Sequence, residues 1–127
     1  MVNSYRDLLV WQRGMDLVES VYQVTRSFPR HEVYGLTAQL RRAAVSVPSN
    51  IAEGHGRRHL GDYLHHLSIA NGSLFELETH LLLAQRLTYV LPAEAETASR
   101  LSGEVGRMLA GLARALRRGQ SGRVARP

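Results

Sequence analysis

The sequence predicts an all-α fold, an antiparallel bundle of about four helices, and three observations carry that prediction. Apolar residues recur at steps of three and four along most of the chain, which is the spacing of one helix face. No segment alternates apolar and polar residues as a half-buried strand does. The connections marked by proline and glycine are short, and short connections favour antiparallel neighbours.

The first helix is expected from about Asp7 to Arg26. Two apolar stripes run side by side over this range, a width typical of a core helix that contacts more than one neighbour. Their members are Leu8, Trp11, Met15, Val18, Tyr22 and Thr25 in one stripe and Val10, Leu17, Val21, Val24 and Phe28 in the other. The helix is expected to end at Phe28 and Pro29, because the residue before a proline is pushed out of the helical region.

The second helix is expected to begin within residues 31–34, and it contains Pro48. A proline inside a helix removes the hydrogen bond to the carbonyl four residues back, here Ala44, at a cost of about 3 kcal/mol. The helix therefore either bends at Pro48 or stops and restarts with Asn50 as N-cap and Glu53 completing a capping box. We favour the bend.

The third helix has the most regular pattern of the four. Its apolar row keeps an unbroken alternation of three and four, which favours nearly parallel packing: Leu60, Tyr63, Leu67, Ala70, Leu74, Leu77, Leu81, Ala84 and Thr88. Leu91 and Pro92 make a turn, and the fourth helix follows. The last stretch, Gly119 to Pro127, is rich in Gly and Arg and offers little apolar surface to bury. We therefore expect one bundle domain over residues 1–118 and a disordered basic tail over 119–127.

The composition restricts the compartment and the chemistry. The 127 residues contain no cysteine, which excludes disulfides and thiolate chemistry and favours the reducing cytoplasm. The first seven residues lack a signal-peptide pattern, and no stretch approaches the roughly 18 apolar residues of a membrane span. A soluble, cytoplasmic protein is expected.

Positive charge gathers toward the C-terminus. The net charge is +5 and every basic residue apart from histidine is Arg. On the expected fourth helix, Glu104 stands between Arg100 and Arg107 at pairing distance along the helix, so these three are expected to form surface pairs. The remaining arginines have no such partner: Arg114, Arg117, Arg118, Arg123 and Arg126. They are candidates for binding nucleic-acid phosphates, and the open alternative is a solubilising tail. No aromatic residue is interleaved with them, so base stacking is not implied.

Metal and catalytic motifs are absent from the sequence. A di-iron site in a bundle needs Glu-x-x-His on two helices, and no Glu-x-x-His occurs. The nearest candidates are Asp62 with His65, and His55 with His59. No Gly-x-Ser-x-Gly elbow or spaced triad stands out. We expect no cofactor, no metal and no enzymatic activity.

A polar row on the expected second helix is the other notable feature. Gln39, Arg42, Ser46, Asn50 and Glu53 share one face, and Ser73, Glu76 and His80 form a comparable row on the third helix. Arg42 is expected to meet Glu76 or Glu53 between the two helices, in a network that specifies register instead of adding stability. The alternative is an ordinary solvated face.

Three segments together resemble a known family. They read YRDLLVWQ, YGLTAQLRRAAVSVPSNIAEGHGR and LSIANGSLFELETHLLLAQRLTYV, within Tyr5 to Val90. They are similar to the bacterial four-helix-bundle family encoded by intervening sequences of large-subunit ribosomal RNA genes. The resemblance implies an up-down-up-down bundle with a proline-bent second helix, assembled as a homo-oligomer, expected to be a pentamer. A related branch contains accessory proteins of diversity-generating retroelements, which bind a reverse transcriptase and nucleic acid.

Two functional classes follow as expectations. The first is a nucleic-acid-associated adaptor whose C-terminal arginines contact RNA or DNA phosphates without sequence preference. The second is a scaffold that holds another protein on the surface of the oligomer and has no role with nucleic acid. In the first case binding weakens steeply with salt and is lost on truncation after Ala113.

Overall fold

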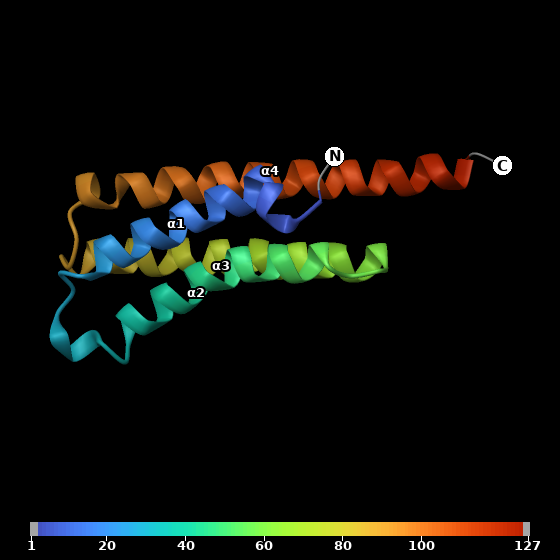
Figure 1. Cartoon of the computed structure of the whole chain (residues 1–127). Coiled ribbons are helices and arrows are strands. Elements are labelled where there is room, and N and C mark those ends of the chain that lie inside the picture. The colour runs from blue at the N-terminus through green and yellow to red at the C-terminus, as the bar shows by residue number, and fades with distance from the viewer. Residues whose placement is uncertain (1–2, 126–127) are drawn as a thin grey trace.

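The computed structural model describes residues 3–125, and it describes side chains as far as Gly119. This part of the chain contains α1 (Leu9–Thr25), α2 (Leu36–His55), α3 (Leu60–Arg86) and α4 (Pro92–Ala125), two short 3-10 helices at Tyr5–Asp7 and Arg30–Glu32, and no strand. Figure 1 shows the four helices side by side in an elongated bundle. The all-helical prediction is confirmed. None of the helices within residues 3–125 is both long and apolar enough to cross a membrane.

The first two α-helices begin later than expected, and local hydrogen bonds explain both delays. The Ser4 hydroxyl accepts a hydrogen bond from the Arg6 amide, which closes a 3-10 turn before α1. At the start of α2, Glu32 Oε1 accepts from the Leu36 amide at 3.0 Å, and Tyr89 donates its hydroxyl to Glu32 Oε2 at 2.9 Å. The hydrogen bond from Leu36, followed by that from Tyr89, lowers the pKa of the Glu32 carboxyl.

Pro48 lies inside one continuous helix, so α2 does not stop and restart. Figure 1 shows α2 changing direction partway along its length. Asn50 is not an N-cap, because its amide group donates to the carbonyl and hydroxyl of Ser46 at 2.8 and 3.0 Å. The Pro48 ring lies against α1 where Gly14 has no side chain, and a Cβ built on Gly14 would lie 3.5 Å from Pro48 Cβ. The bend therefore lets α2 approach α1 closely.

The fourth helix extends beyond the expected domain boundary at residue 118. It begins at Pro92 as expected, and its helical backbone continues to Ala125. Gly119 and Gly122 each disfavour a helix by about 1 kcal/mol, but no proline interrupts the chain before Pro127. The disorder predicted for residues 119–127 remains a prediction, and residues 126–127 lie outside the described part.

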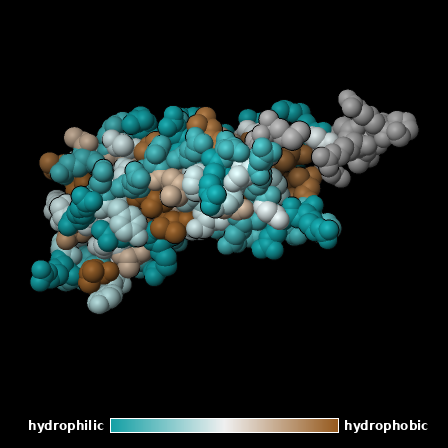
Figure 2. Space-filling model, viewed as in Figure 1, coloured by the Kyte–Doolittle hydropathy of each residue, from teal (hydrophilic) through white to brown (hydrophobic). Residues whose placement is uncertain are grey.

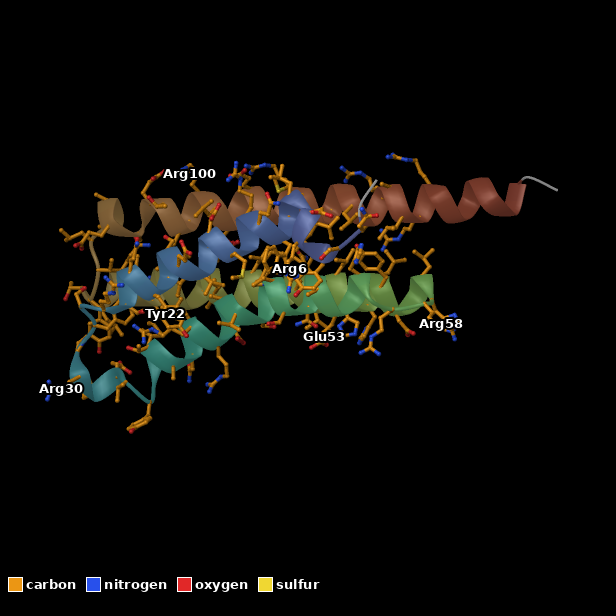
Figure 3. All side chains as sticks on the ribbon, viewed as in Figure 1. Arg6, Tyr22, Arg30, Glu53, Arg58 and Arg100 are labelled. Carbon is orange, nitrogen blue, oxygen red and sulfur yellow. The ribbon has the colours of Figure 1, made fainter. Side chains whose placement is uncertain are left out.

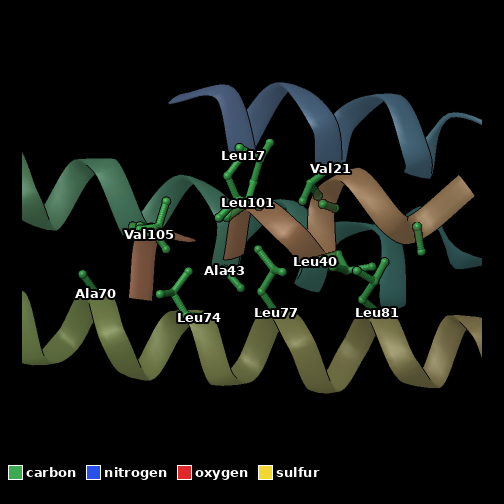
Figure 4. Packing of buried hydrophobic residues seen from close by; sticks show 14 of the residues in the cluster. Leu17, Val21, Leu40, Ala43, Ala70, Leu74, Leu77, Leu81, Leu101 and Val105 are labelled. Carbon is green, nitrogen blue, oxygen red and sulfur yellow. The ribbon is translucent and has the colours of Figure 1, made fainter. Parts of the chain in front are cut away.

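A single apolar core runs along the bundle. Figure 4 shows leucines and alanines of α3 facing side chains from α1, α2 and α4. The fully enclosed members include Leu17, Leu40, Ala44, Val47, Ile51, Ala70, Leu77, Ala84, Ala98 and Val105. Leu17, Ala70, Leu77 and Ala84 belong to the apolar rows that predicted the first and third helices. Completely burying one leucine stabilises the fold by about 1.5–3 kcal/mol. Burial of these core side chains therefore makes the largest contribution to the stability of the bundle.

Two polar contacts fix α4 against its neighbours. Arg13 of α1 donates to Glu104 at 3.1 Å, and the buried Ser102 hydroxyl donates to Glu78 of α3 at 2.7 Å. Glu104 was expected to pair with arginines of its own helix. It reaches α1 instead, and Arg100 pairs with Glu96 at 3.8 Å. Sequence spacing predicted the wrong partner for Glu104, because it carries no information on which helix lies beside α4.

Gly54 provides a test of the α2–α3 packing. A Cβ at Gly54 would lie 2.9 Å from His66 Cβ and 3.0 Å from Tyr63, so Gly54→Ala forces the helices apart. We expect the free energy of unfolding to fall by about 1–3 kcal/mol. Gly72→Ala is the matched control, because nothing lies within 4 Å of that Cβ, and it should add up to about 1 kcal/mol. Chemical denaturation measures both, and equal stabilisation by the two variants would contradict the close packing.

Candidate nucleic-acid interface

Three of the five candidate arginines have described side chains, and all three are exposed on α4. Arg114, Arg117 and Arg118 form no ion pair with any other described residue. Arg123 lies within the bounds of α4, but its side chain is outside the described set, and Arg126 is outside the described residues. The described arginines are therefore free to meet an external anion.

The fold brings a second group of basic residues to the same region. Arg57, Arg58 and His59 connect α2 to α3 and are exposed, and Figure 3 shows Arg58 where that hairpin turns. A cavity of about 230 Å³ separates this connection from α4. Its lining consists of Arg57, Arg58, His59, Leu60, Tyr63, Ala115, Leu116 and Gly119. We call these eight residues the end cavity, and the three α4 arginines with Arg57, Arg58 and His59 the basic end.

The end cavity exists because the helices differ in length. At 1.5 Å per residue, the 17 residues of α1 span about 26 Å, whereas the 34 residues of α4 span about 51 Å. Figure 1 shows α1 starting short of the α2–α3 turn, while α4 continues past it. No helix of the described chain fills the place beside the turn, so a hollow remains there.

Tyr63 supplies an aromatic side chain to this arginine-rich region. Tyr63 lies in the first turn of α3 and is half-buried, and its ring meets the His55 ring edge-on with the two centroids 6.0 Å apart. Burial raises the pKa of the Tyr63 hydroxyl, so the group is neutral at physiological pH. Sequence analysis did not place an aromatic residue near the C-terminal arginines, because Tyr63 is far from them along the chain and only the packing of α3 near α4 brings it to this region.

The predicted polar network forms between α2 and α3 in part. Asn50 Oδ1 lies 2.9 Å from His66 Nδ1, and the Ser73 hydroxyl donates to Ser46 Oγ at 2.8 Å. Glu53 approaches His66 Nδ1 at 3.7 Å. The sequence interpretation omitted His66. His66, Ser73 and His80 follow one another at intervals of seven residues, and this spacing could have identified His66 as a member of the row.

The other predicted members do not join this network within the chain. Gln39, Arg42 and Glu76 are exposed, and none of them makes a side-chain hydrogen bond or ion pair with a described residue. The expected contact of Arg42 with Glu76 or Glu53 is therefore not formed within the chain. All three lie toward the outside of their helices, where a pair would be open to solvent. His80 Nδ1 is buried and has no hydrogen-bond partner among the described residues.

The two candidate pairs of metal ligands are Asp62 with His65 and His55 with His59. Within the described residues, neither pair belongs to a larger cluster of metal-ligating side chains. Among the residues that the structure describes, no group of three or more His, Asp or Glu side chains is placed to hold a metal ion. His65 and His66 rings lie near each other, with centroids 6.1 Å apart, and His55 packs against Tyr63.

Two apolar surfaces remain exposed on different parts of the bundle. The α3 strip consists of Ile69, Phe75, Leu82 and Leu83, and Phe75 and Leu82 are 62% and 60% exposed. The α1–α2 groove, of about 310 Å³, is lined by Tyr5, Trp11, Met15, Val18, Val45, Pro48, Ser49 and Ala52. Figure 2 shows a hydrophobic patch in the middle of the face that α1 and α2 form. Exposed apolar patches commonly mark interaction sites.

Comparisons with known proteins confirm the family suggested by the sequence. Residues 6–111 match the family model described as 23S rRNA-intervening sequence protein. The chain is also similar to a solved structure, a protein of unknown function from the S23 ribosomal protein family of Bacteroides thetaiotaomicron. The identity is 20%, the TM-score is 0.74, and the alignment covers 83% of this chain and 98% of that chain, so the likeness concerns the fold. No curated protein matches the chain.

The α2–α3 network predicts a difference between two residues of the same helix. Asn50→Ala removes the hydrogen bonds that join Asn50 to Ser46 and to His66, and we expect it to lower the free energy of unfolding by about 1–3 kcal/mol. Arg42→Met removes only an exposed side chain, and the expected change is within about 0.5 kcal/mol. Urea unfolding at one fixed protein concentration compares them. Equal effects of the two substitutions would show that the network does not hold the helices together.

Proposed function

The chain belongs to the family of 23S rRNA-intervening sequence proteins, and from this premise we propose that it is a non-enzymatic, oligomeric bundle that binds nucleic acid through its basic end. The observation that supports this proposal most is that Arg114, Arg117 and Arg118 are exposed on α4 at the same end of the bundle where Arg57 and Arg58 line the end cavity. The family match ends at residue 111. The α4 arginines are thus a feature of this chain beyond the matched region.

Phosphate binding is supported by the charge and exposure of the basic end. Its arginines have no acidic partner among the described residues, so binding a phosphate does not first break an ion pair. Each guanidinium that neutralises a phosphate also releases a condensed counterion, which makes the affinity strongly salt-dependent. We propose contacts to the phosphate backbone of RNA or DNA without sequence preference. The cysteine-free chain suits the cytoplasm, where such partners occur.

The oligomeric part of the proposal is supported by the α3 strip and the α1–α2 groove. The bulky apolar residues of the α3 strip lie outside the bundle, and exposed apolar patches commonly mark interaction sites. The two apolar surfaces differ in residues and lie on different helices. A contact between two unlike surfaces is head-to-tail, and such contacts close into rings when the rotation allows. We propose an antiparallel, up-down-up-down bundle repeated in a ring, with a pentamer as the expected closure.

Assembly would strengthen weak phosphate contacts. Each copy carries one basic end, and linked copies bind a polyanion with an effective concentration that a single copy lacks. A few exposed arginines on one chain bind nucleic acid only weakly, so assembly is needed to raise the affinity of the basic ends.

A scaffold for another protein is the second candidate. The observation that favours it is the same α3 strip, which a different polypeptide would cover as well as a second copy would. In that case binding of the partner survives nuclease and high salt.

Substitution tests the arginines better than truncation does, because Leu116 packs against the core and truncation after Ala113 removes it. In a variant with Arg114, Arg117 and Arg118 changed to Gln, we expect the slope of log affinity against log salt to fall by about 2 to 3. The matched control changes Arg26, Arg30 and Arg86, which are also exposed and lie outside the basic end. Fluorescence anisotropy with a structured RNA measures both. Equal slopes for the two variants would contradict phosphate binding at the basic end.

The α3 strip predicts the loss of assembly on a single substitution. Phe75→Glu places a charge at an exposed position, so the bundle should fold normally while the contact between copies fails. Sedimentation velocity should show a particle of the 14.2 kDa chain instead of an oligomer. Tyr34→Glu is the control, because Tyr34 is 94% exposed and lies outside the strip. An unchanged oligomer in Phe75→Glu would exclude the strip as the interface.

A further inference from the structure

The end cavity combines three kinds of side chain. Arg57, Arg58 and His59 border it with positive or hydrogen-bonding groups. Leu60, Ala115 and Leu116 give it apolar walls, and Tyr63 contributes an aromatic ring. A ligand that uses the whole lining must carry an anion beside a flat group with apolar faces.

A nucleotide has this chemistry, because a phosphate stands beside a planar base. We propose that the end cavity binds one unpaired nucleotide of a single-stranded nucleic acid, with the base between Tyr63 and Leu116 and the phosphate on Arg57 and Arg58. This inference rests on the proposed function and adds to it a preference for single strands. Inorganic phosphate alone would leave the apolar walls of the end cavity in contact with water. An apolar ligand alone would leave the guanidinium groups of Arg57 and Arg58 without a partner.

The size of the cavity favours one nucleotide over a larger ligand. Its volume of about 230 Å³ is below the roughly 300–1,000 Å³ of pockets that enclose whole small molecules. Bases of a duplex are covered by their neighbours in the stack and cannot enter. An unpaired base can turn out of the strand and stack on an aromatic side chain, as is common in single-strand recognition. The α4 arginines then hold the phosphates that follow.

The first experiment uses the unaltered full chain. Adenosine 5′-monophosphate, adenosine and inorganic phosphate are titrated separately, and the methyl resonances of Leu60 and Leu116 are followed by NMR. The nucleotide should shift both resonances, and it should do so at lower concentration than adenosine or phosphate. If the nucleotide acts no differently from inorganic phosphate, the cavity does not take a base and the inference is wrong.

The second experiment fills the cavity without changing charge. Nothing lies within 4 Å of a Cβ at Gly119, so Gly119→Leu occupies the hollow without disturbing the helix. Gly61→Leu is the matched control, because that Cβ also meets nothing and Gly61 does not line the cavity. The unaltered chain and Gly61→Leu should bind a short single strand about tenfold more tightly than a duplex with the same number of phosphates. Gly119→Leu should lose this preference and keep its duplex affinity.

The outcomes separate this inference from the proposed function. If Gly119→Leu keeps the preference, the inference fails, and salt-dependent binding of both nucleic acids leaves the proposed function intact. If neither strand nor duplex binds while the mononucleotide still shifts Leu60 and Leu116, the proposed function fails and the cavity takes a free nucleotide only. RNA and DNA strands of one sequence distinguish the two polymers, and thermal melting by circular dichroism confirms that each variant is folded.

Discussion

The difference in length between α1 and the other helices determines where this bundle is closed and where it is open. Over the extent of α1, four helices enclose the apolar core, and Leu17 and Val21 complete it from the α1 side. Beyond the start of α1, the only α-helix of the described chain beside the α2–α3 connection is α4. The end cavity and the basic end both lie in this open part. A longer first helix would fill the cavity and cover its arginines.

Close approach of the helices depends on residues that disfavour a helix interior. Pro48 bends α2 over Gly14 of α1, and Gly54 lets α3 come within contact of the α2 backbone through Tyr63 and His66. Between these points, the hydrogen bonds of Asn50 and Ser46 satisfy polar groups that the approach brings partly out of water. Pro48 and Gly14 thus serve the contact between α1 and α2, whereas Gly54 and the polar row serve the contact between α2 and α3.

The sequence predicted the helices well, because burial of one face imposes a period that can be read directly. The row from Leu67 to Ala84 is an example, since every position on it is buried in the fold. Contacts between helices were harder to predict. Glu104 has two arginines within reach on its own helix, and only the neighbouring α1 explains why Arg13 is its partner. Tyr63 joins the basic end for the same reason, because tertiary packing sets its neighbours and sequence distance does not.

The central claim is that copies of this bundle assemble and that their basic ends bind nucleic acid by phosphate contacts. Size exclusion coupled to light scattering, with and without a structured RNA and at two salt concentrations, measures both properties in one experiment. We predict a mass several times that of the 14.2 kDa chain, with RNA in the same peak at low salt and separated from it at high salt. A single-chain mass, or RNA that elutes apart from the protein at both salt concentrations, would contradict the account.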